Sequence, residues 1–201
     1  DQRIRKELEW DGDVLTNEHH YSHAASAYYA SGFNEATVVT MDAVGEWDST
    51  TIGYGKGNKL TLTHSIHFPD SLGMLYSALT YYLGFKVNSA EYKVMGLAPY
   101  GDMNKKTNPY YNKLKQVIDI KDDGSFRLKM DYFIYHYADR MPSKKLCRLV
   151  DGPILKKESE MTGRHKDIAA ALQLITEEIL TNILNHVHRV VKCDNLVLAG
   201  G

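Results

Sequence analysis

The stretch ATVVTMDAVGEWDSTTIGYGKGNKLTLTHSIHF, from Ala36 to Phe68, predicts three consecutive strands. Ala36–Asp42 is rich in β-branched residues, which favour extended backbone. Glycines punctuate Ser49–Gly57, and Lys59–Phe68 alternates apolar with polar side chains. We expect these strands to form an antiparallel meander.

Two helices are predicted on either side of this meander. Asn17 is a candidate N-cap for a helix over Glu18–Ser31, which is rich in alanine and ends before Gly32. After the third strand, apolar residues recur with a 3.6-residue period from Leu72 to Leu83, and Gly84 closes the pattern. We expect this second helix to pack on the sheet.

The rest of the chain predicts further elements. Apolar residues on one face indicate a long helix over Lys166–Arg189, which leads into NLVLAGG, Asn195–Gly201, a buried strand ending on a glycine pair. Asn88–Asp102 is expected to be a structured loop, Pro109–Ile120 a short amphipathic helix, and Ser125–Phe133 a strand or extended segment. This order of strands and helices indicates an α/β fold with a mixed sheet flanked by helices.

Composition bounds the possible partners. The 201 residues are 43% hydrophobic and 24% charged, as in an ordinary globular domain. Lys and Arg total 24 against 25 Asp and Glu, so no net field attracts nucleic acid or an anionic membrane. No apolar run reaches the length of a membrane span, and the N-terminus is too charged for a signal peptide. With Cys147 and Cys193 as ordinary thiols, a cytoplasmic protein is expected.

The segment NEHHYSHAASAYYASGF, residues 17–33, carries three histidines. On a helix, His19 and His23 lie four residues apart and share a face, whereas His20 points roughly 100° away. Such a pair can chelate a metal, although capping, packed or solvent-facing histidines are alternatives. Asp42 ends the next strand and supplies a candidate carboxylate ligand. Two histidines and one carboxylate suit iron, and a zinc site remains an alternative.

The turn after Asp42 contains Gly45 and is followed by the hydroxyls of Ser49, Thr50 and Thr51. This is where α/β proteins place phosphate and metal chemistry, but an ordinary β-hairpin has the same residues. Gly200 and Gly201 form either a tight turn or a cradle for a nucleotide.

Five motifs in order resemble one known family: EHHYSHAASAYY from Glu18, the D-x-x-G-E turn from Asp42, SLGMLYSALTYYLGF, EYKVMGLAPYG and the final LVLAGG. From about Asp13 to Gly201 the chain looks like the NodU/CmcH carbamoyltransferases, bacterial enzymes that carbamoylate a hydroxyl of an antibiotic or a nodulation factor. The resemblance implies an actin-like ATPase (ASKHA) fold, with residues 1–201 covering the end of one lobe and most of the next. It also implies that the start and end of this Kae-like domain, and a YrdC-like domain, lie outside the chain.

Site residues follow from the same resemblance. It implies that His19, His23 and Asp42 bind iron, with a fourth ligand, an aspartate, downstream of the glycine pair. It places the carbamoyladenylate site at the turn from Asp42 and the residues near it, and makes Asp131 a candidate for holding the acceptor. His20 is available as a general base, but a hydrogen-bonded role beside the metal ligands, or a place at the surface, is at least an equal alternative. The nucleotide-site residues that the resemblance implies are Val44, Gly45, Glu46, Ser71, Gly73, Glu91, Gly200 and Gly201.

The implied substrates are carbamoyl phosphate, ATP and a hydroxylated small-molecule acceptor, with iron as the cofactor and Mg²⁺ possible for the adenylation step in the other domain. A complete catalytic cycle is not expected from this fragment alone. Alternatives are a non-catalytic ASKHA nucleotide-binding module and a related carbamoyl or threonylcarbamoyl transferase. A kinase-like phosphotransferase is disfavoured, because Mg²⁺ prefers oxygen ligands to a histidine pair.

Overall fold

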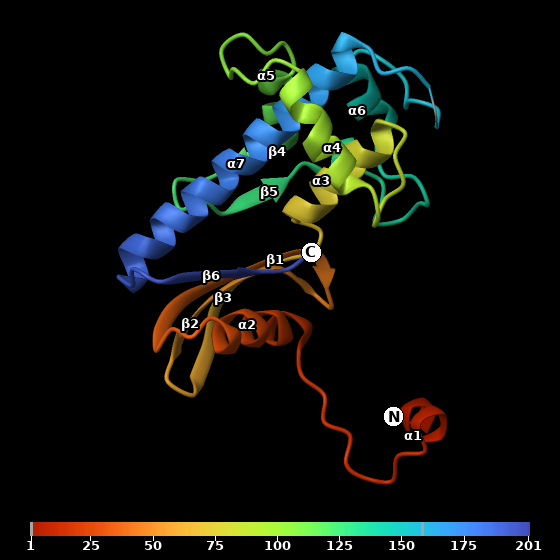
Figure 1. Ribbon diagram of the computed structural model, residues 1–201. Coiled ribbons are helices and arrows are strands. Elements are labelled where there is room, and N and C mark those ends of the chain that lie inside the picture. The colour runs from red at the N-terminus through yellow and green to blue at the C-terminus, as the bar shows by residue number, and fades with distance from the viewer. Residues whose placement is uncertain (1, 158) are drawn as a thin grey trace.

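The computed structural model describes residues 2–157 and 159–201. Residues 19–157 and 159–201 form layers around a central sheet, whereas the N-terminal helix lies apart from them (Figure 1). Helix α2 covers one face of the sheet, and α3 and α7 cover the opposite face. The helices are α1 (Gln2–Leu8), α2 (His19–Ala30), α3 (Leu72–Tyr82), α4 (Glu91–Leu97), α5 (Tyr111–Leu114), α6 (Lys144–Leu149) and α7 (Gly163–Val191). Short 3-10 helices are η1 (Ala98–Tyr100), η2 (Lys115–Val117) and η3 (Met130–Tyr132).

The sheet is mixed, as predicted, with the strand order β3-β2-β1-β6. Strands β1, β2 and β3 pair antiparallel and confirm the meander, whereas β6 pairs parallel to β1. Strand β1 is therefore central, and its residues 36–40 are all buried because both faces of the sheet are covered. The strands are β1 (Glu35–Gly45), β2 (Asp48–Lys56), β3 (Lys59–His67) and β6 (Leu196–Ala199), and β4 (Ile118–Ile120) and β5 (Phe126–Leu128) form a separate pair.

Each face of the sheet has its own core. The large core joins α3, α4, α7 and the segments between them, and it includes Leu79, Leu172 and Ile175. The small core lies between α2 and the sheet, where Tyr28 and Ala24 pack with Val38 and Val197. Tyr28 fits because Gly55 leaves room for it: a Cβ on Gly55 would lie 2.5 Å from the Tyr28 ring.

The main helices end where the sequence indicates. Gly32 and Gly84 follow α2 and α3 with left-handed φ values of 75° and 77°, which confirms the two predicted stop signals. The Ser71 hydroxyl accepts a hydrogen bond from the Met74 N–H and so caps the start of α3. Helix α7 contains the whole of the predicted helix Lys166–Arg189.

Three local predictions are wrong. Helix α2 is capped by Glu18, without a side-chain cap bond, so Asn17 is not its N-cap. Residues 88–102 contain α4 and η1 rather than a loop, because Val94 and Ala98 bury an apolar stripe that Gly96 and Pro99 obscure in the sequence. The predicted helix Pro109–Ile120 is α-helical only over α5 and then continues as η2 and β4.

Two further predictions need correction. The segment Ser125–Phe133 is a strand only over β5 and is interrupted by η3, although Lys129 and Phe133 on either side of η3 have extended backbone. Strand β6 lies at an edge of the sheet, so Leu196 and Leu198 are 40% and 51% exposed and only Val197 is buried. The run of apolar residues in LVLA resembles a strand covered on both faces, but one face of β6 is open.

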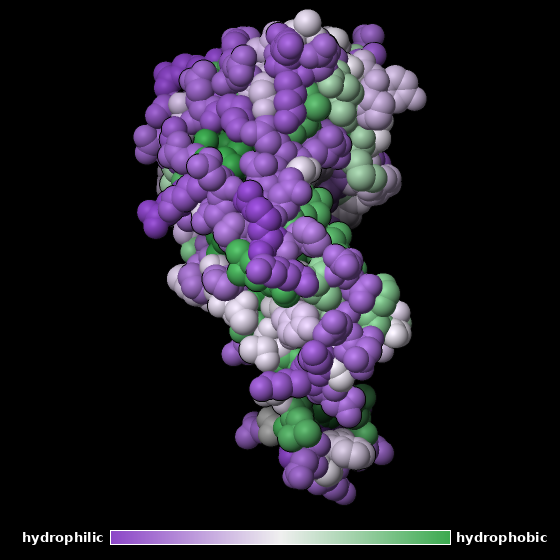
Figure 2. Space-filling model, turned by 90° about the vertical axis from the view of Figure 1, so that its left-hand side faces the viewer, coloured by the Kyte–Doolittle hydropathy of each residue, from purple (hydrophilic) through white to green (hydrophobic). Residues whose placement is uncertain are grey.

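Cys147 and Cys193 are both free thiols, in agreement with the sequence prediction. Among the described residues, no helix combines the length and the apolar character that crossing a bilayer requires. Figure 2 shows a face that is largely hydrophilic, with hydrophobic residues in small separate groups.

Glu178 on α7 holds the segment before β4 against that helix. Its carboxylate accepts hydrogen bonds from Lys105, Tyr111 and Lys115, with the Lys105 Nζ at 3.0 Å. Burial alone would raise the pKa of Glu178, but the hydrogen bonds from Lys115, Tyr111 and Lys105 outweigh it and lower the pKa from 4.5 to about 2.

The sign of this shift predicts an acid-sensitive contact. Because the folded-state pKa lies below the unfolded value, the stabilisation is present above pH 4.5 and is lost as the pH falls towards 2. We expect the wild-type free energy of unfolding to lose about 1–3 kcal/mol to this group over that range, given its partial exposure. Glu178→Gln should remove this part of the pH dependence, whereas the adjacent exposed Glu177→Gln should keep it. Urea denaturation at stepped pH measures both, and equal slopes in the two variants would contradict the assignment.

Candidate metal centre

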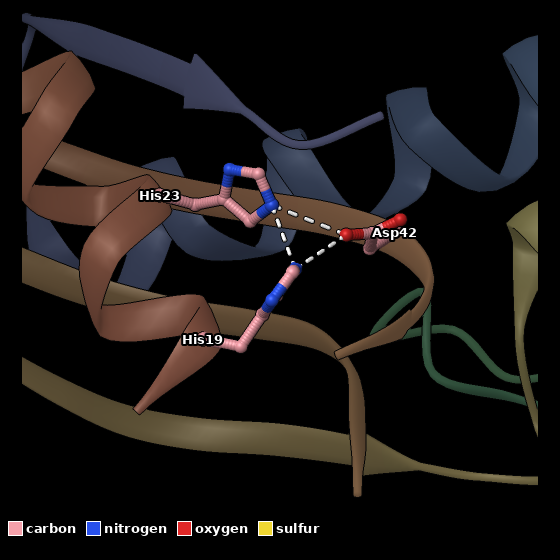
Figure 3. Close-up of side chains that lie close together, drawn as sticks. All are labelled: His19, His23 and Asp42. Atoms are coloured by element: carbon pink, nitrogen blue, oxygen red, sulfur yellow. Dashed lines mark hydrogen bonds and ion pairs between the residues drawn. The ribbon is translucent and has the colours of Figure 1, made fainter. Parts of the chain in front are cut away.

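Three side chains converge at the carboxyl end of β1 (Figure 3). The Asp42 Oδ2 lies 2.8 Å from the Nε2 of His19 and 3.1 Å from the Nε2 of His23. The two Nε2 atoms are themselves 2.9 Å apart. The helical spacing of four residues thus places both imidazoles of α2 on the carboxylate of Asp42. Asp42 lies three residues before the end of β1, where the pairing with β2 is interrupted between Met41 and Gly45.

The spacing of these three atoms fits a metal ion. Ligand atoms about 2.1 Å from an ion and at right angles to one another are separated by about 3.0 Å, whereas tetrahedral ligands are separated by about 3.4 Å. The observed separations of 2.8, 2.9 and 3.1 Å match the right-angled, facial arrangement. Two histidines and one carboxylate on one face of an octahedron form the donor set of many non-haem iron sites.

The carboxylate is oriented and remains ionised. The Asp42 Oδ1 accepts a hydrogen bond of 2.7 Å from the Ala43 N–H, which leaves Oδ2 directed at the histidines. Burial raises the pKa of Asp42, but hydrogen bonds from His19, the Ala43 N–H and His23 outweigh it and lower the pKa below 3.8. The side chains of His19 and His23 are 42% and 30% exposed, so the centre is open on one side.

His20 occupies a different face of α2 from the other two histidines. It is 2% exposed and lies on the stripe of α2 that also buries Ala24 and Tyr28 against the sheet. Its Nδ1 lies 2.6 Å from the Thr40 Oγ1, and its Nε2 lies 2.9 Å from the carbonyl oxygen of Asp48. Burial lowers the pKa of His20, which the hydrogen bond to the Asp48 carbonyl only partly offsets.

Glycines allow three segments to approach the end of β1 closely. A Cβ on Gly45 would lie 2.4 Å from the His19 ring, and one on Gly73 would lie 2.7 Å from the Ala43 backbone. A Cβ on Gly200 would lie 1.6 Å from the Met41 carbonyl oxygen, and Gly200 has a φ of 120°. The next residue, Gly201, lies beside the Asp42 Oδ1, which a Cβ there would approach to 3.6 Å.

Ser71 joins the start of α3 to the same strand end. Its hydroxyl lies 3.1 Å from the Asp42 carbonyl oxygen and 2.6 Å from that of Ala43, and it also accepts the Met74 N–H. Ser71 is fully buried, so this contact lies beneath the surface of the site. The N-terminus of α3 is therefore held next to the candidate metal ligands.

The other residues singled out from the sequence lie in varied positions. Val44 and Glu46 belong to the β1–β2 hairpin, where Val44 is 39% exposed and Glu46 has a φ of 61° in the turn. The Glu91 carboxylate accepts hydrogen bonds from the Ser77 hydroxyl, at 2.8 Å, and from the N–H groups of Asn88 and Ala90. Ser77 lies about 9 Å along the helix axis from Ser71, so Glu91 is remote from the strand end. Asp131 lies in η3, is largely exposed and pairs with Lys145 at 3.2 Å.

The hydroxyls after the turn are engaged inside the protein. Ser49 donates to main-chain carbonyls, with the Asp70 oxygen at 2.5 Å, and Thr51 lies 2.6 Å from the Thr40 hydroxyl. Thr50 is buried, and its hydroxyl has no hydrogen-bond partner within residues 2–157 and 159–201. The sequence analysis did not single out Thr40, because its contact with His20 depends on how α2 crosses the sheet.

The chain is similar to several known proteins. The family described as "Carbamoyltransferase N-terminus" matches residues 3–201. The uncharacterized protein sll1178 of Synechocystis sp. is 50% identical over 94% of this chain. Nodulation protein NolNO of Sinorhizobium fredii is 35% identical over 91% of this chain.

The chain spans only 30% of the length of sll1178 and 25% of that of NolNO. Among solved structures, a Ppx/GppA phosphatase of Aquifex aeolicus aligns with 99% of this chain and 65% of its own, at 18% identity and a TM-score of 0.27. A score this low carries no argument about the fold.

The close approach of α3 to β1 predicts the effect of a single methyl group. Gly73→Ala should lower the free energy of unfolding by about 1–3 kcal/mol, because the added Cβ overlaps the Ala43 backbone, which cannot rotate away. Gly96→Ala is the matched control: Gly96 also lies in a helix, but nothing lies within 4 Å of its added Cβ. The control should stabilise the protein by roughly 0.5–1 kcal/mol through helix propensity. Urea denaturation of both variants tests this, and an equal response would refute the close approach.

Proposed function

This chain belongs to the carbamoyltransferase N-terminus family, and from that premise we propose that it carries the metal centre of an O-carbamoyltransferase. The enzyme transfers a carbamoyl group from carbamoyladenylate to a hydroxyl of a small-molecule acceptor. Carbamoyladenylate is made from carbamoyl phosphate and ATP in another part of the same protein. In the transfer, the oxygen of the acceptor hydroxyl forms a bond to the carbamoyl carbon and its proton passes to a base. The bond from that carbon to the phosphate oxygen breaks, and AMP leaves with the electron pair of that bond.

The observation that carries the proposal is the convergence of His19, His23 and Asp42 within 2.8–3.1 Å of one another. These are the described residues that could together hold a metal ion. We propose iron(II) as the metal, because the right-angled spacing of two imidazoles and one carboxylate suits it. When bound, the ion supplies a Lewis acid and a template for the phosphate of the adenylate.

The nucleotide part of the site is proposed on the ends of β1 and β6, within an actin-like ATPase fold. The backbone of Gly45, in the hairpin, and that of Gly200 and Gly201 lie beside the metal ligands without side chains in the way. Main-chain N–H groups in such turns can share the charge of a phosphate. Ser71 and Gly73 contribute by holding the N-terminus of α3 at the strand end.

Other residues have more indirect proposed roles. Val44 and Glu46 shape the hairpin that borders the proposed adenylate site, and Glu91 supports the site by fixing the start of α4. Asp131 is proposed to contact the acceptor, for which its exposed carboxylate is available beside Lys145. The 35% identity to a nodulation protein supports a sugar of a nodulation factor as one acceptor class, beside an antibiotic.

Metal titration of the chain tests the proposal. We expect anaerobically added Fe²⁺, or Co²⁺ as a spectroscopic probe, to bind with about one equivalent per chain, because three ligand atoms already converge. His19→Ala together with His23→Ala should weaken binding by about tenfold or more, since two of the three ligands are lost.

The control variant removes two other imidazoles, by His64→Ala and His136→Ala, at exposed positions outside the cluster. It should bind the metal as the wild type does. Equal binding by the His19/His23 variant and this control would remove the metal centre and leave a non-catalytic module as the better account.

The whole protein that contains this chain tests the reaction. With carbamoyl phosphate, ATP and a hydroxylated acceptor, its product should gain the mass of one carbamoyl group. Asp42→Asn should reduce this product at least about tenfold, because the amide is neutral and a poorer ligand. Mass spectrometry of the acceptor measures both results, and undiminished transfer by the Asp42 variant would contradict the proposed role.

A further inference from the structure

We propose that His20 is a positioning residue for the metal centre, which it aligns through a buried chain of hydrogen bonds to Thr40, Thr51 and the Asp48 carbonyl. This inference rests on the proposed function, because it assigns His20 a role in keeping His19 and His23 directed at Asp42. His20 itself is no ligand, since both of its ring nitrogens are already engaged within the protein.

The partners of His20 define the direction of each hydrogen bond in this buried network. The Asp48 carbonyl can only accept, so the His20 Nε2 carries the proton and donates across 2.9 Å. In the neutral ring the Nδ1 is then an acceptor, and it takes the Thr40 hydroxyl proton across 2.6 Å. The Thr40 oxygen is left to accept from the Thr51 hydroxyl, also at 2.6 Å. One arrangement therefore satisfies all three side chains.

These contacts link the helix that carries two metal ligands to the strands around the third. His20 lies on α2, Thr40 on β1, and Thr51 and Asp48 on β2. His20, Thr40 and Thr51 are at most 2% exposed, so water does not compete for their bonds. A buried polar network whose members are all satisfied favours a single arrangement of the elements that it joins.

Not every buried threonine hydroxyl near the site has a hydrogen-bond partner, as those of Thr40 and Thr51 have. Thr37 on β1 and Thr50 on β2 are also buried, at 3% and 1% exposure, yet their hydroxyls have no hydrogen-bond partner among the described residues. The hydroxyls of Thr40 and Thr51 are thus matched to His20 by position. Thr37 also offers a control on the same strand as Thr40.

Steric contact transmits the position of His20 to the metal ligand next to it. Gly45 touches both rings: its added Cβ would lie 2.4 Å from the His19 Cδ2 and 2.6 Å from the His20 Cδ2. The ring centroid of His20 lies 5.6 Å from that of His19 and 6.0 Å from that of His23. A tilt of His20 would therefore move the first turn of α2 against the hairpin.

The start of α2 has no side-chain cap to hold it in place. Its N-cap residue, Glu18, makes no side-chain cap bond. At the other end of the helix, the Tyr28 hydroxyl bonds to the carbonyls of Asn34 and Gly57. His20 is the corresponding polar anchor at the end that carries His19 and His23. Ligands of a metal must be held within about 0.5 Å of their productive positions, which makes this anchor relevant to affinity.

The test compares isosteric variants in a Co²⁺ titration of the chain. Thr40→Val removes the hydroxyl that His20 requires without changing a ligand or the size of the side chain. We expect it to weaken Co²⁺ binding by about tenfold, as for other residues that orient metal ligands, and to change the visible absorption spectrum of the bound Co²⁺. Thr37→Val removes a buried hydroxyl that has no partner, and it should leave affinity and spectrum unchanged.

A second variant separates positioning from general stability. His20→Gln keeps a donor for the Asp48 carbonyl and should lower affinity less than His20→Phe, which keeps none. The double variant Thr40→Val, His20→Phe should bind Co²⁺ no more weakly than His20→Phe alone, because both substitutions act through the same network of hydrogen bonds. Urea denaturation without metal shows that each variant is folded before its affinity is measured.

The possible failures are distinguishable. If the wild type binds Co²⁺ but Thr40→Val and His20→Phe bind it with unchanged affinity and spectrum, the positioning role is wrong while the metal centre stands. If the wild type binds no Co²⁺, the metal centre and the positioning role both fail. A loss of affinity that is the same in Thr37→Val and Thr40→Val would also overturn the role, since it would not depend on His20.

Discussion

The structure depends on how closely other backbone segments approach the carboxyl end of β1. The first turn of α2, the N-terminus of α3 and the residues after β6 all meet there, and a Cβ on Gly45, Gly73 or Gly200 would overlap a neighbour. Glycine removes that overlap, so two helix starts and one loop surround one carboxylate. Because the site is assembled from backbone contacts, its geometry is a property of the sheet and its covering helices as much as of Asp42.

Helix α2 shows how one short element serves packing and chemistry at once. Its inward stripe of His20, Ala24 and Tyr28 docks on the sheet, and its neighbouring edge carries His19 and His23 to the strand end. The helix has little amphipathic contrast in its sequence, since a histidine and a tyrosine stand where aliphatic residues are usual. Polar groups in the buried stripe add direction to the docking, because hydrogen bonds, unlike apolar contacts, define one angle of approach.

Much of this was accessible from the sequence, for identifiable reasons. Period-two and period-3.6 patterns predicted the meander, α3 and α7, and the four-residue spacing of His19 and His23 brought them together as expected. Helices α4 and η1 are not predicted, because Gly96 and Pro99 are weak helix formers. Tertiary burial of Val94 in α4 and Ala98 in η1 stabilises them. The contact of His20 with Thr40 was not predictable, because it depends on the crossing of α2 over the sheet and on a strand register that no local pattern encodes.

The position of β6 has a practical consequence for handling the isolated chain. Within the part of the chain that the structure describes, β6 is an outer strand of four residues, and Leu196 and Leu198 stand beside its outward backbone groups. An edge of this kind can recruit an extended segment from another molecule. Concentrated samples would then self-associate by sheet extension, and a lysine at position 196 or 198 is a natural gatekeeper against it.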